Sequence, residues 1–240
     1  MKSKKPNLHS TKLAPFTVWF SQSEEFHTLK QEIFTQDAYY TEFDTTEPVI
    51  IDAGAHIGLA SLYFKKLYPK ARIWAVEPLL ETFTILKRNV EENVLLDVEL
   101  MNAALTESGS QSTIYFDNTP LKWWSTAGRE NGAWNHQQDS QSRQVPSVQL
   151  SSLIKRINAP IDLIKMDIEG NELVVLKEAQ SDLENVKNMI IEFHPIKTQT
   201  LSHLLTLLDS SGFSWDLWQN GKAVSTDRLK GLVYIQATRN

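Results

Sequence analysis

The sequence contains no cysteine in its 240 residues. This absence excludes disulfide bonds, thiolate zinc sites and a cysteine nucleophile, and it fits a protein of the cytoplasm. Long apolar runs are also missing, and none approaches the roughly 18 residues that a membrane-spanning helix needs. The basic stretch MKSKKPNLHSTK at residues 1–12 is not followed by the apolar core of a signal peptide. We therefore expect a cytoplasmic protein without a membrane span, in which residues 1–12 form a frayed tail.

The sequence has no excess of basic residues. Its 24 lysines and arginines are outnumbered by 29 acidic residues, and the net charge is -5. A protein that binds nucleic acid regardless of sequence needs a basic face to displace counterions, so we expect no nucleic-acid partner. Hydrophobic content of 41% and charged content of 22% are ordinary for a globular protein. The length favours one domain with a few added elements.

Internal repeats and low-complexity tracts are absent too, and one polar block stands out. Residues 119–144 read as a continuous loop, which is longer than a compact domain usually tolerates. Such loops are often lids or binding loops, although a disordered insertion has a similar composition. Trp123, Trp124 and Trp134 favour a folded flap or substrate loop, because disordered segments are poor in tryptophan.

Elsewhere, short apolar runs alternate with stretches of helical periodicity. Runs that end in a turn signal predict buried strands, and apolar residues on one face predict helices. The predicted strands are 49–53, 72–77, 97–105, 112–118, 161–167 and 186–194, followed by a hairpin pair at 213–225 and 231–239. The predicted helices are 57–68, 79–90, 150–157, 172–179 with Asn171 as its cap, and 201–208. This alternation indicates an α/β fold with a mostly parallel sheet.

The stretch VIIDAGAHIGLASLYF at residues 49–64 contains the most informative turn. Ligands of parallel sheets bind at the carboxyl ends of the strands. Gly54 and Gly58 bracket a strand-to-helix turn, where glycine permits a close backbone approach and the helix offers unpaired N–H groups. Glu77 ends the next strand, 19 residues after Gly58, and its carboxylate can accept hydrogen bonds from a ribose diol. The pattern predicts an adenosine-binding site.

This turn lacks the middle glycine of the G-x-G-x-x-G pattern that dinucleotide sites use. It reads G-A-H-I-G, so His56 fills part of the space that a pyrophosphate would need. Asp52 adds negative charge, which suits a sulfonium better than phosphates. The pattern therefore favours S-adenosyl-L-methionine as the cofactor. A turn whose glycines serve packing alone, an NAD-linked oxidoreductase and a catalytically inactive cofactor-binding relative are the alternatives.

Four segments resemble, in order, the FkbM-type S-adenosylmethionine-dependent methyltransferases. They are IDAGAHIG (51–58), VEP (76–78), VQLSSLIKRINAPIDLIKMDIEGNELVVL (148–176) and IIEFHP (190–195). The third is the most specific, because it combines a K-x-D strand end with a D-x-E-G-x-E signature. The resemblance covers roughly residues 49 to 195, and the stretch FHTLKQEIFTQDAYY before it is similar to the family's lead-in helix. One departure is His56, where the family usually has asparagine.

The resemblance implies a Rossmann-like methyltransferase fold with a seven-stranded, mostly parallel sheet whose last strand is antiparallel. Residues 1–46 would form the tail and lead-in helix, and residues 47–240 the methyltransferase domain. The resemblance also implies O-methylation of a hydroxyl on a sugar, a polysaccharide or a secondary metabolite. We therefore expect a small-molecule or glycan acceptor as the partner.

We assign cofactor binding to the residues at the strand ends. Glu77 would clamp the ribose, while Asp52 and the backbone around Gly54 would hold the methionine end. Asn102 and Ala103 would border the adenine. The full predicted set is Asp52, Gly54, Ala55, His56, Gly58, Glu77, Pro78, Asn102, Ala103 and Asp167.

Methyl transfer to a hydroxyl needs aligned reactants and a base that takes the proton. The catalytic candidates are Asp167, Glu169 and His194, and the resemblance places Asp167 near the methyl donor. His194 would titrate near the working pH, while Glu169 could instead accept backbone N–H groups. With Glu192 they form a cluster that could take Mg²⁺, although the predicted site includes no metal. Residues that could shape the acceptor pocket are Trp123, Trp124, Arg129 and Trp134.

Overall fold

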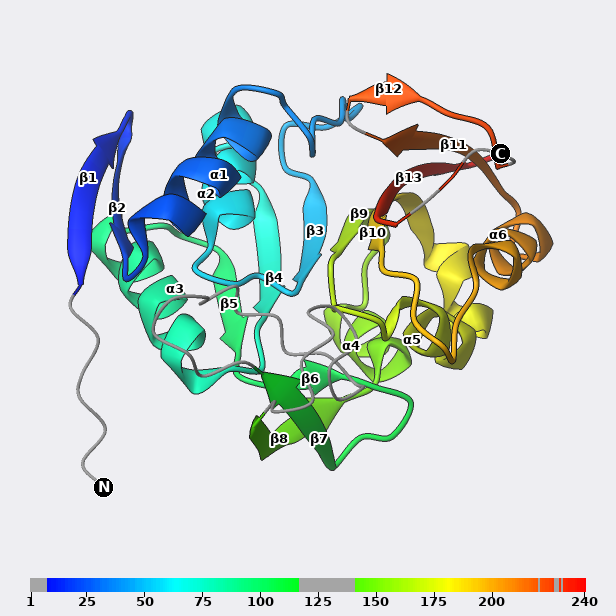
Figure 1. Cartoon of the computed structure of the whole chain (residues 1–240). Coiled ribbons are helices and arrows are strands. Elements are labelled where there is room, and N and C mark those ends of the chain that lie inside the picture. The colour runs from blue at the N-terminus through cyan, green and yellow to red at the C-terminus, as the bar shows by residue number, and fades with distance from the viewer. Residues whose placement is uncertain (1–7, 117–140, 220, 227–228, 230) are drawn as a thin grey trace.

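A computed structural model describes residues 8–116, 141–219, 221–226, 229 and 231–240. Most of the predicted flap, including Trp123, Trp124, Arg129 and Trp134, lies outside these ranges. Within them, a central sheet of eight strands has the order β12-β11-β13-β10-β9-β3-β4-β5 (Figure 1). Its strands are β3 (Val49–Ala53), β4 (Arg72–Val76), β5 (Val98–Met101), β9 (Ile161–Met166), β10 (Val186–Phe193), β11 (Phe213–Gln219), β12 (Lys222–Ala223) and β13 (Val233–Arg239).

The pairing of these strands confirms the Rossmann-like methyltransferase fold. Strands β5, β4, β3, β9 and β10 run parallel to one another, and the last strand, β13, lies antiparallel between β10 and β11. The expected seven strands are all present. The eighth, β12, has two residues and extends the edge by pairing with the end of β11.

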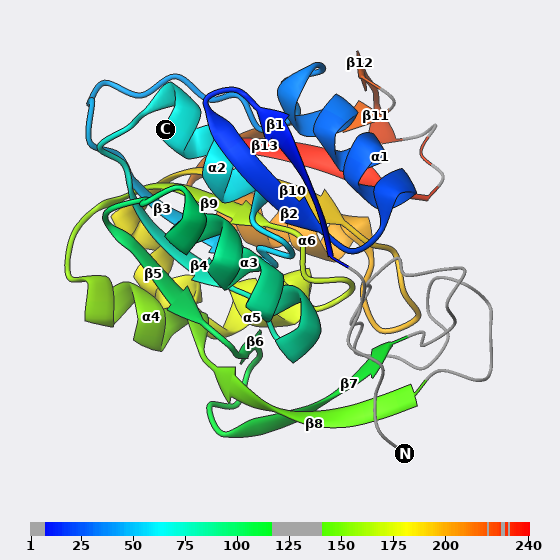
Figure 2. The ribbon, with the colours of Figure 1, turned by 90° about the vertical axis from the view of Figure 1, so that its left-hand side faces the viewer.

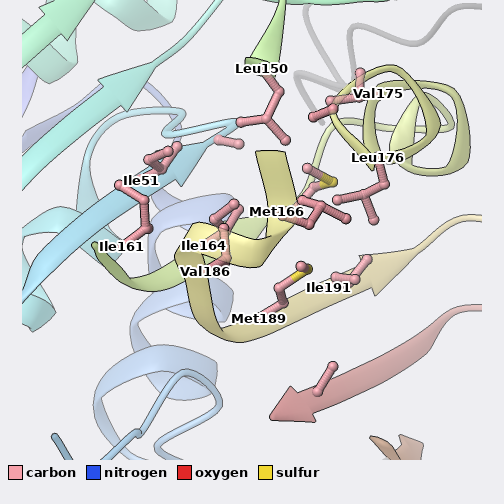
Figure 3. Close-up of a cluster of buried hydrophobic side chains, with 14 of the residues drawn as sticks. Ile51, Leu150, Ile161, Ile164, Met166, Val175, Leu176, Val186, Met189 and Ile191 are labelled. Atoms are coloured by element: carbon pink, nitrogen blue, oxygen red, sulfur yellow. The ribbon is translucent and has the colours of Figure 1, made fainter. Parts of the chain in front are cut away.

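Helices cover both faces of the sheet, as parallel strands require. One face carries α1 (Ser23–Phe34), α2 (Leu59–Leu67) and α3 (Leu80–Glu92), and the other carries α4 (Leu150–Ile157), α5 (Glu172–Glu178), α6 (Leu201–Ser210) and the 3-10 turn η1 (Gln180–Asn185) (Figures 1 and 2). Adjacent strand residues alternate between the layers, so Ile50 packs with the first group and Ile51 with the second. Figure 3 shows Ile51 with Met166 and Leu176 in the second layer.

A second, smaller sheet departs from the predicted pattern. The expected strand at 97–105 is interrupted after β5, and β6 (Ala104–Leu105) joins β8 (Gln141–Val148) and β7 (Gln111–Phe116). The interruption occurs at Asn102, whose side-chain amide donates to the Glu77 and Pro78 carbonyls. Residues 141–144 belong to β8, so the prediction of a loop is wrong for these four residues.

The prediction of a frayed tail is wrong for residues 9–12. They form most of β1 (His9–Leu13), which pairs antiparallel with β2 (Phe16–Phe20) beside α1 and α3 (Figure 2). The hairpin is ordered because alternate β2 residues are buried, and Phe20 stacks on Phe26 of α1. Helix α1 overlaps the segment 26–40 that resembles the lead-in helix, but it begins at Ser23 and ends at Phe34, and the five predicted helices of the main domain are present. No helix among the described residues has the length and apolar character that a bilayer crossing requires.

Candidate active site

One cavity of about 210 Å³ lies at the carboxyl ends of β3, β4 and β9, beneath α1. Eight of the predicted site residues line it: Gly54, Ala55, His56, Glu77, Pro78, Ala103, Asp167 and Glu169. Four others do not line it: Asp52, Gly58, Asn102 and His194. The carboxyl ends of the strands therefore converge as expected, but these four residues do not face the cavity.

The Gly54 turn is held between the ends of two neighbouring strands. Its N–H and that of Ala55 both donate to the Val76 carbonyl, at 2.9 Å each. Gly54 has a φ of +74°, and a Cβ built on it would lie 1.7 Å from the carbonyl oxygen of Asp167. Glycine is therefore required here both by conformation and by the approach of the Asp167 backbone.

Glu77 is buried and fixes the turn above it. One carboxylate oxygen, Oε2, accepts the His56 N–H at 3.0 Å. The other, Oε1, accepts the Leu79 N–H at 2.9 Å and the Thr82 hydroxyl at 2.8 Å. A carboxylate has about four acceptor positions, so one remains for a ligand hydroxyl. Burial raises the pKa of Glu77 even though these donors and His56 oppose the shift.

Helix α1 contributes three residues to the cavity wall, and one of them also contacts His56 of the cofactor turn. Glu25, Leu29 and Ile33 line the cavity wall, and Glu25 Oε1 lies 3.3 Å from His56 Nε2. His56 itself has a φ of +51°. Burial lowers the pKa of His56, but the Glu25 carboxylate outweighs this effect and holds that pKa above its ordinary value. The lead-in helix is thus part of the site.

Asp52 lies behind the cavity wall and contacts Lys165. Asp52 has no exposed surface and accepts the Ser61 hydroxyl at 2.6 Å. Its other oxygen, Oδ1, lies 3.4 Å from Lys165 Nζ, which also donates to the Gly54 carbonyl at 2.7 Å. Lys165 Nζ is 3.9 Å from Asp167 Oδ2 as well. Asp52 therefore reaches the site through Lys165 rather than by direct contact with the cavity.

His194 follows β10 and lies among acidic side chains. Its Nδ1 is 3.0 Å from Oε1 of Glu172, which is fully buried. Its Nε2 is 3.4 Å from Glu169 Oε2, 3.8 Å from Asp167 Oδ1 and 4.0 Å from Glu192 Oε1. Glu172 also accepts the Gly170 N–H at 3.0 Å, so its role is to orient His194 and the start of α5.

The charges in this cluster shift one another's pKa. Burial lowers the pKa of His194, but Glu169 and Glu172 more than offset this and raise it to about 10. Burial raises the pKa of Glu169 to about 8, against the lowering effect of His194. The pKa of Glu192 is also raised by burial and by Asp167. His194 is therefore protonated at neutral pH in this arrangement, which differs from the expected titration near the working pH.

Sequence reasoning missed Lys165 and Tyr39 as site residues. Lys165 is the lone basic residue in the buried strand IDLIKM, and a charge inside an apolar run was a usable signal. Tyr39 follows α1, and its hydroxyl donates to Glu192 Oε2 at 3.4 Å. No pattern marks Tyr39, because its contact joins residues 153 positions apart. Asn171 was expected to cap α5, but its side chain makes no cap hydrogen bond.

Comparison with known proteins assigns the chain to a family. The model of the methyltransferase FkbM domain matches residues 52–215. Methyltransferase sdnD of Sordaria araneosa is 32% identical over 197 residues, which cover 70% of this chain and 74% of that protein. Methyltransferase 1 of Beauveria bassiana is 29% identical over 210 residues, covering 79% and 82% respectively.

A solved structure shares the fold. The crystal structure of a methyltransferase FkbM from Methylobacillus flagellatus matches with a TM-score of 0.51 and 18% identity, over 83% of this chain. The match spans 47% of that longer chain. With the family model matching most of the sequence, this protein belongs to the FkbM methyltransferase family.

Proposed function

We propose that this methyltransferase uses S-adenosylmethionine to methylate a hydroxyl on a sugar, a polysaccharide or a secondary metabolite. The observation that supports this proposal best is that Gly54, Glu77, Asp167 and Glu169 all line the same cavity. Residues suited to holding the cofactor and residues suited to accepting a proton thus face the same space. The two relatives from Sordaria araneosa and Beauveria bassiana are both named methyltransferases, which supports the methyl-donor chemistry.

The residues around the cavity fit this cofactor. Glu77 keeps one acceptor position for a ribose hydroxyl, and the apolar walls at Ala103 and Leu105 suit the adenine ring. The Asp167 carboxylate lines the same cavity and attracts a positive sulfonium. When bound, S-adenosylmethionine supplies an electrophilic methyl group.

We assign the base role to the carboxylates rather than to the histidine. A hydroxyl becomes an effective nucleophile as a positioned base takes its proton. Asp167 and Glu169 line the cavity, whereas His194 lies behind them. His194 would then stabilise the charge and the position of Asp167 and Glu169. It remains the third candidate for the general base.

The experiment that tests the cofactor is a calorimetric titration with S-adenosylhomocysteine and, separately, with NAD. We expect micromolar or tighter binding of S-adenosylhomocysteine and none of NAD. Glu77→Gln should weaken binding at least about tenfold, equivalent to about 1.4 kcal/mol. Glu81→Gln is the control, because Glu81 pairs with Arg143 and lies outside the cavity. Binding of NAD alone, or an equal loss in both variants, would contradict the proposal.

The acceptor class is tested by transfer of label from methyl-labelled S-adenosylmethionine to a panel of glycosides and free hydroxylated metabolites. We expect the product to carry the label on oxygen, and Asp167→Ala to reduce transfer strongly without abolishing S-adenosylhomocysteine binding. Label found only on nitrogen or carbon would refute O-methylation while leaving the cofactor assignment intact.

A further inference from the structure

We propose that Asp167, Glu192 and His194 form a site for one divalent metal ion beside the cavity. One ligand atom from each of these residues lies within 4.8 Å of the others. The three come from the adjoining ends of β9 and β10, which are parallel neighbours in the sheet. Ligands that surround a cation at about 2.1 Å each are themselves separated by about 3 to 4 Å, and His194 Nε2 lies at 3.8 Å and 4.0 Å from the two carboxylates.

The orientation of His194 matches that of a metal ligand. Its Nδ1 faces the fully buried Glu172 at 3.0 Å, so Nε2 is the nitrogen directed at the acids. Glu172 is itself fixed by Gly170 and Gln199. Metal-binding histidines usually have such a carboxylate partner on the second ring nitrogen, because it sets the tautomer and the ring orientation.

Buried oxygen atoms that accept no hydrogen bond lie in this cluster and on the cavity wall. Among the described residues, Asp167 Oδ1 and Glu169 Oε2 are buried and accept no hydrogen bond. Asn171 is 7% exposed, lines the cavity, and its Oδ1 likewise accepts none. Buried acceptors that lack donors are destabilising, and a cation would satisfy several of them at once.

The balance of charge also favours a bound cation. Four acidic side chains, those of Asp167, Glu169, Glu172 and Glu192, gather around His194, and Lys165 is the one lysine among the described residues that lies beside them. A protonated His194 is the competing source of positive charge. A divalent ion would supply more charge and would bind the neutral imidazole, with release of its proton.

The donor set indicates the type of metal. Carboxylate oxygens favour Mg²⁺, Ca²⁺ and Mn²⁺, and one imidazole nitrogen moves the preference toward Mn²⁺. Asp167 and Glu192 line the cavity, so an ion held between them could also contact an acceptor hydroxyl. This extension rests on the proposed O-methyltransferase function: the metal would lower the pKa of that hydroxyl as a Lewis acid.

The test is direct measurement of Mn²⁺ binding to the chelator-treated full chain, by the loss of the free-ion electron paramagnetic resonance signal. We expect one Mn²⁺ per chain, and binding at least about tenfold weaker in Asp167→Asn and in Glu192→Gln. Asp162→Asn is the matched control, because Asp162 is the second residue of β9, at the end opposite Asp167, and pairs with Lys187. Its affinity for Mn²⁺ should equal that of the wild type.

Two results would overturn the metal site. One is no binding of Mn²⁺ at millimolar concentration, and the other is binding that both cluster variants retain. If Asp167→Asn fails to fold, Glu192→Gln alone decides. S-adenosylhomocysteine binding by the same chelator-treated protein separates this inference from the proposed function. If that binding persists where Mn²⁺ does not bind, only the metal site is wrong.

Discussion

At the scale of single residues, the site depends on the absence of a Cβ atom at Gly54. A Cβ there would lie 1.7 Å from the Asp167 carbonyl oxygen, and both partners are backbone. We expect Gly54→Ala to lower the free energy of unfolding by more than about 3 kcal/mol, because the ends of β3 and β9 must separate. Chemical denaturation measures this loss, and S-adenosylhomocysteine binding should weaken with it.

Gly221→Ala is the matched control for that substitution. Gly221 also has a positive φ, of +69°, but a Cβ on it would meet no atom within 4 Å. The free energy of unfolding of this control should fall only by the cost of placing alanine at a positive φ, about 1 kcal/mol. Equal losses in the two variants would show that backbone conformation, not the contact with Asp167, makes Gly54 necessary.

Single residues also show what the sequence could and could not predict. Gly54 and Glu77 were found because a turn and a strand end fix where they lie along the chain. Asp52 was predicted to hold the cofactor, yet it is fully buried behind Lys165. Sequence position gives the strand end but not the direction in which each side chain faces, since neighbouring side chains of a strand alternate between the two faces of the sheet.

At the scale of elements, the pairing of α1 with the cofactor turn should depend on pH. The pKa of His56 in the fold lies above its ordinary value because of Glu25. The folded state therefore binds this proton more tightly than the unfolded state. Its contribution is fully present below about pH 6.5 and is lost as the pH rises through the raised pKa.

The measurement is denaturation of the wild type and His56→Asn across this range. The wild type should gain about 1 kcal/mol over the variant near pH 6, and that gain should shrink toward pH 9. Glu25→Gln should flatten the profile in the same way, and the double variant should add nothing further. A difference that is constant with pH would contradict the pairing.

The elements were predicted unequally well, for physical reasons. Buried parallel strands such as β3 and β9 are continuous apolar runs, so their sequences identify them. The strand β8 reads QSRQVPSV and looks like a loop, because it pairs in a small sheet with much of its surface exposed. The hairpin of β1 and β2 is held by α3, a partner that is about 70 residues away along the chain.

At the scale of the whole molecule, Asn89 of α3 links the amino-terminal hairpin to the cofactor turn. Its Oδ1 accepts the Trp19 N–H at 2.6 Å, and its Nδ2 donates to the Trp19 carbonyl at 3.0 Å. Nδ2 also donates to the Ile57 carbonyl at 2.8 Å, inside the Gly54–Gly58 turn. Asn93 makes a similar pair of bonds to Thr17, and its Nδ2 also donates to the Asn89 carbonyl at 2.7 Å within α3. The predicted boundary at residues 46 and 47 is therefore crossed by partly buried hydrogen bonds.

These bonds predict that the hairpin and the sheet unfold together. Asn89→Ala leaves three backbone groups without partners and should lower the free energy of unfolding by about 3 kcal/mol, against about 1 kcal/mol for the less buried Asn93→Ala. Tryptophan fluorescence and circular dichroism should give one coincident transition in both variants. S-adenosylhomocysteine should bind Asn89→Ala more weakly, since the Ile57 carbonyl loses its donor. An early fluorescence transition that leaves the main unfolding and the cofactor affinity unchanged would instead make residues 1–46 a separately folding appendage.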